Sequence, residues 1–233
     1  MAGSGRIFEA DFLRGFAIIL MVIFHFCFDL NHFGYIDIDI YRGEFWKGFR
    51  VVIVSIFLVV MGASLVFAYR GGINPAKFRK RLLLLGGAAA LITFATIFVF
   101  PRSWIYFGII HFVFVATIVG VLFVRAPWVS LVLGILIIAG YQSGHLSTHF
   151  IYSFLQPYLH LPMYTEDIVR FFPWFGTVLI GIFMGNHLFL GLKVPQVDMT
   201  RKIAFLGRHS LLIYLVHQPV LFGPMLLLYH IGN

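Results

Sequence analysis

Apolar runs long enough to cross a membrane recur along the chain, with short polar stretches between them. At 1.5 Å per residue, a helix needs about 20 residues to cross roughly 30 Å of hydrocarbon. The fifth run is short, and Pro101 and Pro127 break the chain between neighbouring runs. We therefore expect an all-α, polytopic integral membrane helix bundle in which residues 1–233 form a single domain. The pattern predicts about seven transmembrane helices, at 12–31, 49–69, 82–100, 104–124, 128–143, 172–190 and 209–229.

The composition agrees with a membrane protein. Of 233 residues, 61% are hydrophobic and 11% are charged, against about 45–50% and about 25% in soluble domains. The formal net charge of +8 would suggest nucleic acid in a soluble protein, but membrane proteins gather basic residues in the loops of one side. We expect the lipid bilayer, and no nucleic acid, as a partner. The single cysteine, Cys27, lies inside the first span and predicts an apolar packing residue.

The positions of lysine and arginine predict the orientation of the chain. With the N-terminus inside, five of the 17 Lys and Arg residues fall on the outer side, which leaves twelve on the inner side. We therefore expect a cytoplasmic N-terminus in a multi-pass protein of the cell membrane. The outer loop at 144–171 is rich in aromatic residues and predicts either an interfacial helix or a lid over an acceptor groove.

The first apolar segment carries a stripe of ionisable residues. At 100° per residue, its five ionisable groups fall within an arc of roughly 60°. Lipid cannot solvate such a stripe, which must therefore face the interior of the bundle or a watery cavity. This stripe is the main indication of function in the sequence. Its members are Asp11, Arg14, His25, Asp29 and His32.

Histidines within the apolar segments are candidate catalytic residues. His25 has Asp29 one turn later on the same face, where a carboxylate can orient the imidazole. His111 is the ionisable group of the fourth segment, and His217 and Gln218 precede Pro219, which frees a backbone carbonyl for a ligand or partner. Each histidine also has a simpler interpretation, a hydrogen bond to a neighbouring helix.

Basic residues at the inner side are candidates for binding an anion. Arg14 and Asp11 are three residues apart and can form an ordinary ion pair, or Arg14 can meet an anion entering from the cytoplasm. The run at 77–81, which includes Arg79, fits the general inner-side excess of positive charge or an attraction for a polyanionic cofactor. Sequence motifs typical of a phosphate-binding loop, a metal site or a nucleophile elbow are absent, so we expect no metal.

Several of these residues lie in an ordered set of short motifs. With these motifs the chain resembles bacterial relatives of the heparan-α-glucosaminide N-acetyltransferase catalytic domain, within the wider group of transmembrane acyltransferases. The motifs are Asp11-x-x-Arg14-Gly15, His25-x-x-x-Asp29-Leu30, FLVVMGAS at 57–64, YFGIIH at 106–111, FPWFG at 172–176 and GRHSLLIYLVHQP at 207–219. In the lysosomal members the histidine regarded as active follows the first span. It corresponds to either His25 or His32 here, and we favour His25.

The resemblance implies acyl transfer across the membrane, from cytoplasmic acetyl-CoA or another acyl-CoA to an amine or hydroxyl of a small-molecule or glycan-like acceptor outside. The phosphates of CoA would lie near Asp11 and Arg14 and near the inner basic residues Arg79 and Arg208. The base would be His25, oriented by Asp29, and a covalent acyl-His25 intermediate is a second route.

Donors to the developing oxyanion would be His111, His217 or Gln218. A proton-coupled transporter or channel, with the His and Asp groups as a proton relay, is the alternative function. An accessory subunit is a third. Two copies related by a two-fold axis would suit a bundle of this size, and no residue decides between monomer and homodimer.

Overall fold

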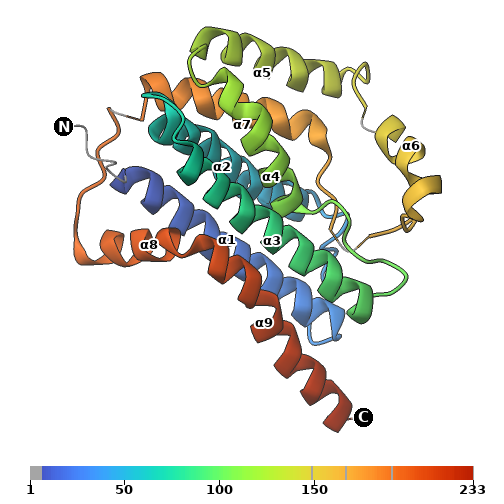
Figure 1. Cartoon of the computed structure of the whole chain (residues 1–233). Helices are drawn as coiled ribbons and strands as arrows, with labels where there is room; N and C mark the ends of the chain where they lie inside the picture. Colours follow the sequence, from blue (N-terminus) through green and yellow to red (C-terminus); the bar gives the residue numbers. More distant parts are fainter. Residues whose placement is uncertain (1–6, 148, 166, 190, 233) are drawn as a thin grey trace. The chain divides into compact units, whose positions relative to one another are not determined.

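The computed structural model describes residues 7–147, 149–165, 167–189 and 191–232. The regular elements of these residues are helices (Figure 1), and an isolated bridge pairs Phe107 with Ile168. The seven apolar segments expected from the sequence all form helices. The helices are α1 (Phe8–His32), α2 (Glu44–Tyr69), α3 (Pro75–Val99), α4 (Ile109–Gly120) with a 3₁₀ turn η1 (Val121–Phe123), α5 (Pro127–Gln142), α6 (His149–Leu159), α7 (Phe171–His187), α8 (Asp198–Arg208) and α9 (Ser210–Gly232).

Four of these helices are long and apolar enough to cross a membrane, namely α1, α2, α3 and α9. Two of the other expected spans are shorter apolar helices, α4 with η1 and α5, and α7 has 17 residues. The chain is therefore an all-α protein with several membrane-spanning candidates, and the count of seven and the cytoplasmic N-terminus stay predictions.

The described residues form two compact units. The first contains α1, the beginning of α2 up to Phe57, and the C-terminal part of the chain from Leu192 with α8 and α9. The second runs from Leu58 to Gly191 and contains the rest of α2 with α3 to α7. The single domain expected over residues 1–233 stays a prediction.

In the first unit, α8 and α9 both pack against α1 (Figure 1). The closest approach involves two glycines, because a Cβ on Gly15 would overlap the backbone carbonyl of Ile203, and a Cβ on Gly207 would overlap that of Asp11. Ala204, also on α8, is fully buried. Small residues thus let the backbones of α1 and α8 touch, as at many helix interfaces in membranes.

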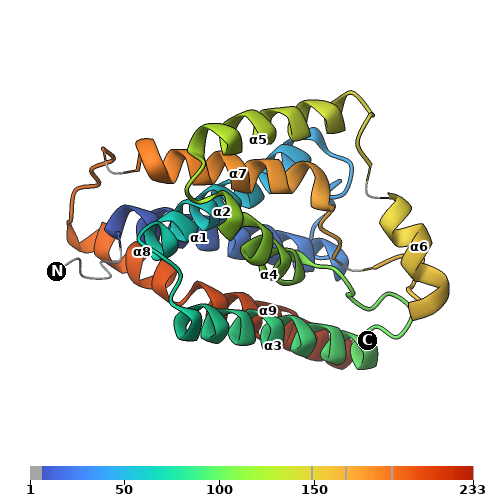
Figure 2. The same ribbon diagram turned by 45° about the horizontal axis from the view of Figure 1, so that its top comes forward.

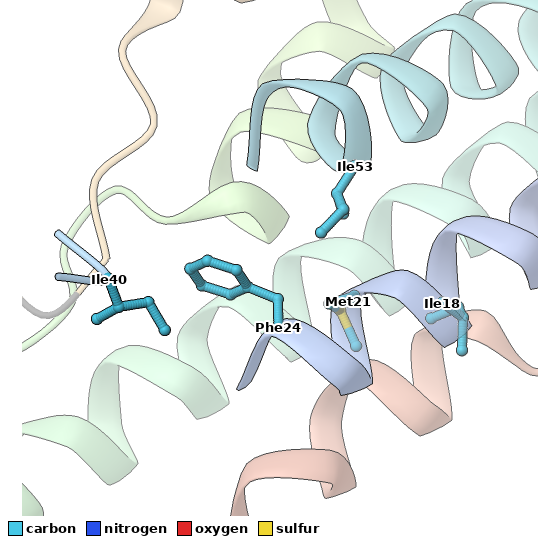
Figure 3. Packing of buried hydrophobic residues seen from close by; sticks show 5 residues of the cluster. All are labelled: Ile18, Met21, Phe24, Ile40 and Ile53. Atoms are coloured by element: carbon cyan, nitrogen blue, oxygen red, sulfur yellow. The ribbon is translucent and has the colours of Figure 1, made fainter. Parts of the chain in front are cut away.

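An apolar cluster fills the first unit beside α1. Ile18, Met21 and Phe24 of α1 meet Ile40 from the following loop and Ile53 of α2 (Figure 3). Cys27 lies against the same cluster, as expected for an apolar packing residue. Ile18 and Met21 fall within or beside the arc of the polar stripe on the helical wheel, and both are buried. The stripe therefore faces the interior, and its middle is closed by apolar side chains.

In the second unit, α7 packs along α5 (Figure 2). It also meets the second part of α2, where a Cβ on Gly62 would overlap the carbonyl of Val178, and one on Gly181 that of Val59. Gly134 and Gly176 bring α5 and α7 equally close. These glycines let the backbones of α7, α5 and the second part of α2 approach one another closely.

The turn before α4 is joined to the loop before α7. Asp167 accepts a hydrogen bond from the backbone N–H of Ile109 (3.1 Å), and Val169 donates to the carbonyl of Phe107 (3.0 Å). Asp167 thus places a carboxyl at the N-terminus of α4, where negative charge is favourable. Burial raises the pKa of Asp167, and the bond from Ile109 opposes this rise.

Two shorter helices complete the chain. Helix α6 lies in the aromatic-rich loop at 144–171, for which the sequence predicts an interfacial helix or a lid. Helix α8 was not predicted, because its 11 residues include Asp198, Arg201, Lys202 and Arg208 and no apolar run.

Candidate active site on α1, α8 and α9

His25 of α1 and His217 of α9 form a pair. Their ring centroids are 4.6 Å apart with an interplanar angle of 77°. Nδ1 of His25 donates to the carbonyl of Met21 (2.9 Å), and Nδ1 of His217 donates to that of Tyr214 (2.6 Å). Because a carbonyl only accepts, both neutral rings carry the proton on Nδ1 and the lone pair on Nε2. The site thus presents two imidazoles of the same tautomer.

The orienting partner of His25 differs from the expected one. The Met21 carbonyl, one turn earlier on α1, fixes the ring, and no hydrogen bond joins His25 to Asp29. The structure therefore does not show the bond expected between Asp29 and His25, and the role of Asp29 in orienting His25 stays a prediction. The cause is helical geometry: a backbone carbonyl at i−4 lies within reach of Nδ1 whatever residue follows at i+4.

Asp29 instead lies fully buried among groups from α1 and α9. The side-chain amide of Gln218 faces its carboxyl, and the ring of His32 interacts with it electrostatically. Neither carboxyl oxygen accepts a hydrogen bond of good geometry. Oε1 of Gln218 and Nε2 of His217 are also buried without a partner. Buried polar atoms in proteins normally have partners, so this group of acceptors indicates a place for a ligand that carries N–H or O–H donors.

A second polar cluster lies near the start of α1, where α8 crosses this helix. Its Arg14 precedes His25 by eleven residues. Asp11 pairs with Arg14 (3.0 Å), as the sequence suggested, and also with Arg208 (3.5 Å). The Asp11 side chain is 5% exposed, whereas those of Arg14 and Arg208 are 24% and 44% exposed. Two guanidinium groups meet one carboxylate here, and guanidinium groups suit an anion.

The two clusters lie about 16 Å apart along the helix axis at 1.5 Å per residue. Ile18 and Met21, both buried, lie between them on α1. The polar stripe expected as one continuous lining is thus two separate polar sites, one at each end of an apolar section.

His32 of the stripe is exposed on the last turn of α1. Its ring lies against Phe28 and Phe222. It has no place in the His25–His217 pair, so the structure gives the two candidates for the family's active histidine different surroundings: a half-buried ring with an imidazole neighbour, and an exposed ring on aromatic neighbours.

His111 and Arg79 belong to the second unit. Nε2 of His111 donates to Oγ1 of Thr93 (2.8 Å), which itself donates to the carbonyl of Ile105, and Nδ1 accepts from the N–H of Gly108 (3.3 Å). Both ring nitrogens therefore have partners, Thr93 within α3 and Gly108 in the turn before α4. The N–H predicted for the oxyanion is already engaged, which is the simpler role that the sequence left open.

His111 and Thr93 also line a cavity of about 470 Å³ between α3 and α4, with Gly86, Ala89 and Phe114 among its other walls. Arg79 is exposed on the first turns of α3.

The role predicted for His217 changes as well. With its proton on Nδ1, neutral His217 presents a lone pair at Nε2 and can donate to an oxyanion there only after gaining a proton. Gln218 retains an amide NH₂ group, which can donate, beside its unpartnered Oε1. The NH₂ group of Gln218 faces the carboxyl of Asp29, and its role as an oxyanion donor stays a prediction.

A family model described as heparan-alpha-glucosaminide N-acetyltransferase, catalytic, matches residues 6–219. The chain belongs to this family. Its members are acetyltransferases that use acetyl-CoA, which confirms the resemblance read from the motifs. The match includes both clusters of α1 and ends just beyond the His217-Gln218 pair. No curated protein and no solved structure matches the chain.

Sequence reasoning missed the two backbone carbonyls, of Met21 and Tyr214, that fix the imidazoles. It also missed that Arg208 joins the pair of Asp11 and Arg14. The i−4 spacing of Met21 and His25 was a usable signal, because a helical histidine commonly finds that carbonyl. The sequence carries no such signal for the approach of Arg208 to Asp11, because that approach depends on the crossing of α1 and α8.

Proposed function

We propose that this protein transfers an acetyl group from cytoplasmic acetyl-CoA to an amine or hydroxyl of a glycan-like acceptor on the outer side of the cell membrane. Family membership supports the reaction and the donor. The single observation that carries the assignment of residues is the arrangement along α1: a cationic cluster at its beginning and an imidazole pair eleven residues later.

The cationic cluster is the proposed contact for the phosphates of CoA. Both Arg14 and Arg208 contact the carboxylate of Asp11, Arg208 is exposed, and Arg14 is partly exposed. Guanidinium forks bind phosphate oxygens through paired charge-assisted hydrogen bonds. Arg79, exposed on α3 of the second unit, stays a separate candidate for attracting the polyanionic cofactor.

The imidazole pair is the proposed site of chemistry. The pantetheine arm would span the roughly 16 Å between the two clusters and bring the thioester to His25. The Nε2 lone pair of His25 accepts the proton as the acceptor nitrogen or oxygen attacks the thioester carbonyl. The C–N or C–O bond forms, the C–S bond breaks, and CoA leaves as its thiolate. The NH₂ group of Gln218 donates to the oxyanion, and holding both substrates in place supplies proximity.

A covalent route remains a second possibility for the same residues. There Nε2 of His25 would itself attack the thioester and carry the acetyl group before the acceptor takes it. Brief incubation with radiolabelled acetyl-CoA in the absence of acceptor distinguishes the routes, because only the covalent route labels the protein.

The function is tested in sealed membrane vesicles of known sidedness. Radiolabelled acetyl-CoA is supplied on the cytoplasmic face, and glucosamine is enclosed on the other face. We expect acetylglucosamine to accumulate inside, and none in vesicles that carry the His25→Ala variant. A pH-gradient-driven uptake of solute without any acetyl product would instead favour a proton-coupled transporter, for which the buried His and Asp groups would serve as the relay.

Arg14→Ala is expected to raise the Kd for acetyl-CoA by about tenfold, the loss of roughly one charge-assisted hydrogen bond. Calorimetry with the purified protein measures it. S-acetylpantetheine, which lacks the nucleotide phosphates, should bind both proteins equally. Arg42→Ala, an exposed arginine of the loop after α1, is the control and should bind acetyl-CoA like the parent. An unchanged Kd for Arg14→Ala would remove this residue from the cofactor site.

A further inference from the structure

The His25–His217 pair has only two nitrogens that can exchange a proton. Nδ1 of each ring donates to a backbone carbonyl, and a carbonyl cannot take the proton away. The two Nε2 atoms remain, on rings whose centroids are 4.6 Å apart. Nε2 of His217 is buried and unpartnered, and the residue as a whole is 7% exposed. A buried nitrogen without a partner in a native protein needs an explanation.

Charged and titratable groups of α1, α2 and α9 surround the pair. Asp29 follows His25 by one turn of α1 and is fully buried, and a buried carboxylate favours a nearby cation. His32 of α1 acts on the same carboxyl. On α9 the ring of Tyr214 is 5.5 Å from that of His217, and on α2 the guanidinium of Arg50 lies 5.9 Å from the ring centroid of Phe24, the neighbour of His25.

We infer that His217 accepts the proton that His25 removes from the acceptor. This inference rests on the proposed acetyl transfer. The acceptor nitrogen or oxygen gives its proton to Nε2 of His25 as the new bond to the acetyl carbon forms and CoA leaves as its thiolate. Nε2 of His25 then passes the proton to the lone pair on Nε2 of His217. The thiolate of the departing CoA finally takes it and leaves as the thiol. His217 acts through His25 and does not contact the reacting atoms. It is therefore a positioning residue that receives the proton from the base.

The assignment explains why two imidazoles of the same tautomer are paired. A single histidine could remove the proton, but it would stay charged until the proton left. A second lone pair beside it returns His25 to the neutral form that the next turnover needs. The unpartnered state of Nε2 in His217 is then the resting state of a proton acceptor.

Rescue by external buffer tests the relay. Acetyl transfer from acetyl-CoA to glucosamine is measured with purified His217→Ala at several concentrations of substituted imidazoles. We expect kcat to fall by about 100-fold, the low end of what a positioned proton-transfer group contributes, with KM for acetyl-CoA unchanged. Added imidazoles should restore kcat saturably, and the restored rate should follow the pKa of the buffer, because the buffer replaces the missing base.

Two further variants separate the relay from a structural role. His217→Gln fills the site without providing a base, and it should show the same loss of kcat with no rescue. His230→Ala removes another imidazole of α9 whose Nδ1 also bonds a carbonyl, that of Leu226 (2.8 Å), and it should keep the parent rate with or without buffer. Full activity in His217→Gln, or rescue that ignores buffer pKa, would overturn the relay alone. A parent protein that forms no acetylglucosamine would overturn the proposed function and the relay together.

Discussion

His25→Ala is expected to reduce the rate of acetyl transfer by about a thousandfold, within the range of 10² to 10⁴ for a positioned acid–base group. The bond from Nδ1 of His25 to the carbonyl of Met21 fixes the ring so that its Nε2 lone pair can accept a proton. Alanine offers no base in its place. The loss should appear in kcat and in kcat/KM equally, since the proton is transferred only in the transition state.

The same variant should keep its affinity for acetyl-CoA. The proposed phosphate contacts, Arg14 and Arg208, lie about 16 Å away along α1 at 1.5 Å per residue. They are joined to Asp11 rather than to His25. Calorimetry of His25→Ala with acetyl-CoA therefore checks that the variant is folded and still binds acetyl-CoA, so that the loss lies in the chemical step.

His32→Ala decides between the two histidines that the family resemblance left open. His32 is exposed against Phe28 and Phe222, so its loss should change turnover far less than loss of His25. The opposite result, with His25→Ala active and His32→Ala inactive, would move the chemistry to the end of α1 and remove His25 from the mechanism.

The helices were predictable from the sequence because each expected span is an apolar run. Such a run can be recognised without knowing which helices pack against it. The inward orientation of the stripe on α1 was predictable for the same reason: Asp11 and Asp29 cannot face lipid, and both are buried. The length of the apolar runs therefore predicted the seven expected helices, and helical periodicity predicted the buried face of α1.

The partners of these residues were less predictable. Arg208 reaches Asp11 only because Gly15 and Gly207 let α1 and α8 touch, and nothing in the spacing of residues separated by almost the whole chain signals that. His217 likewise meets His25 through the packing of α9 on α1. On a helical wheel that shows the polar residues alone, the stripe looks continuous. Ile18 and Met21, on or beside the same arc, interrupt it.

The contact of α1 with α8 thus supports the site without taking part in chemistry. It places Gly207 against the carbonyl of Asp11, and the next residue, Arg208, extends to the carboxyl of that same aspartate. A backbone shift at this point changes the fold of the first unit and the proposed cofactor site together.

Gly207→Ala is accordingly expected to destabilise the protein by about 3 kcal/mol, the upper end of typical overpacking costs. The added methyl group would overlap the backbone carbonyl of Asp11, which cannot rotate away as a side chain can. Gly48→Ala on α2 is the matched control: a Cβ there has nothing within 4 Å, and alanine favours a helix over glycine by about 1 kcal/mol. Thermal unfolding in detergent should therefore shift down for the first variant and stay level or rise for the second. Equal behaviour of the two variants would mean that α1 and α8 do not touch at Gly207.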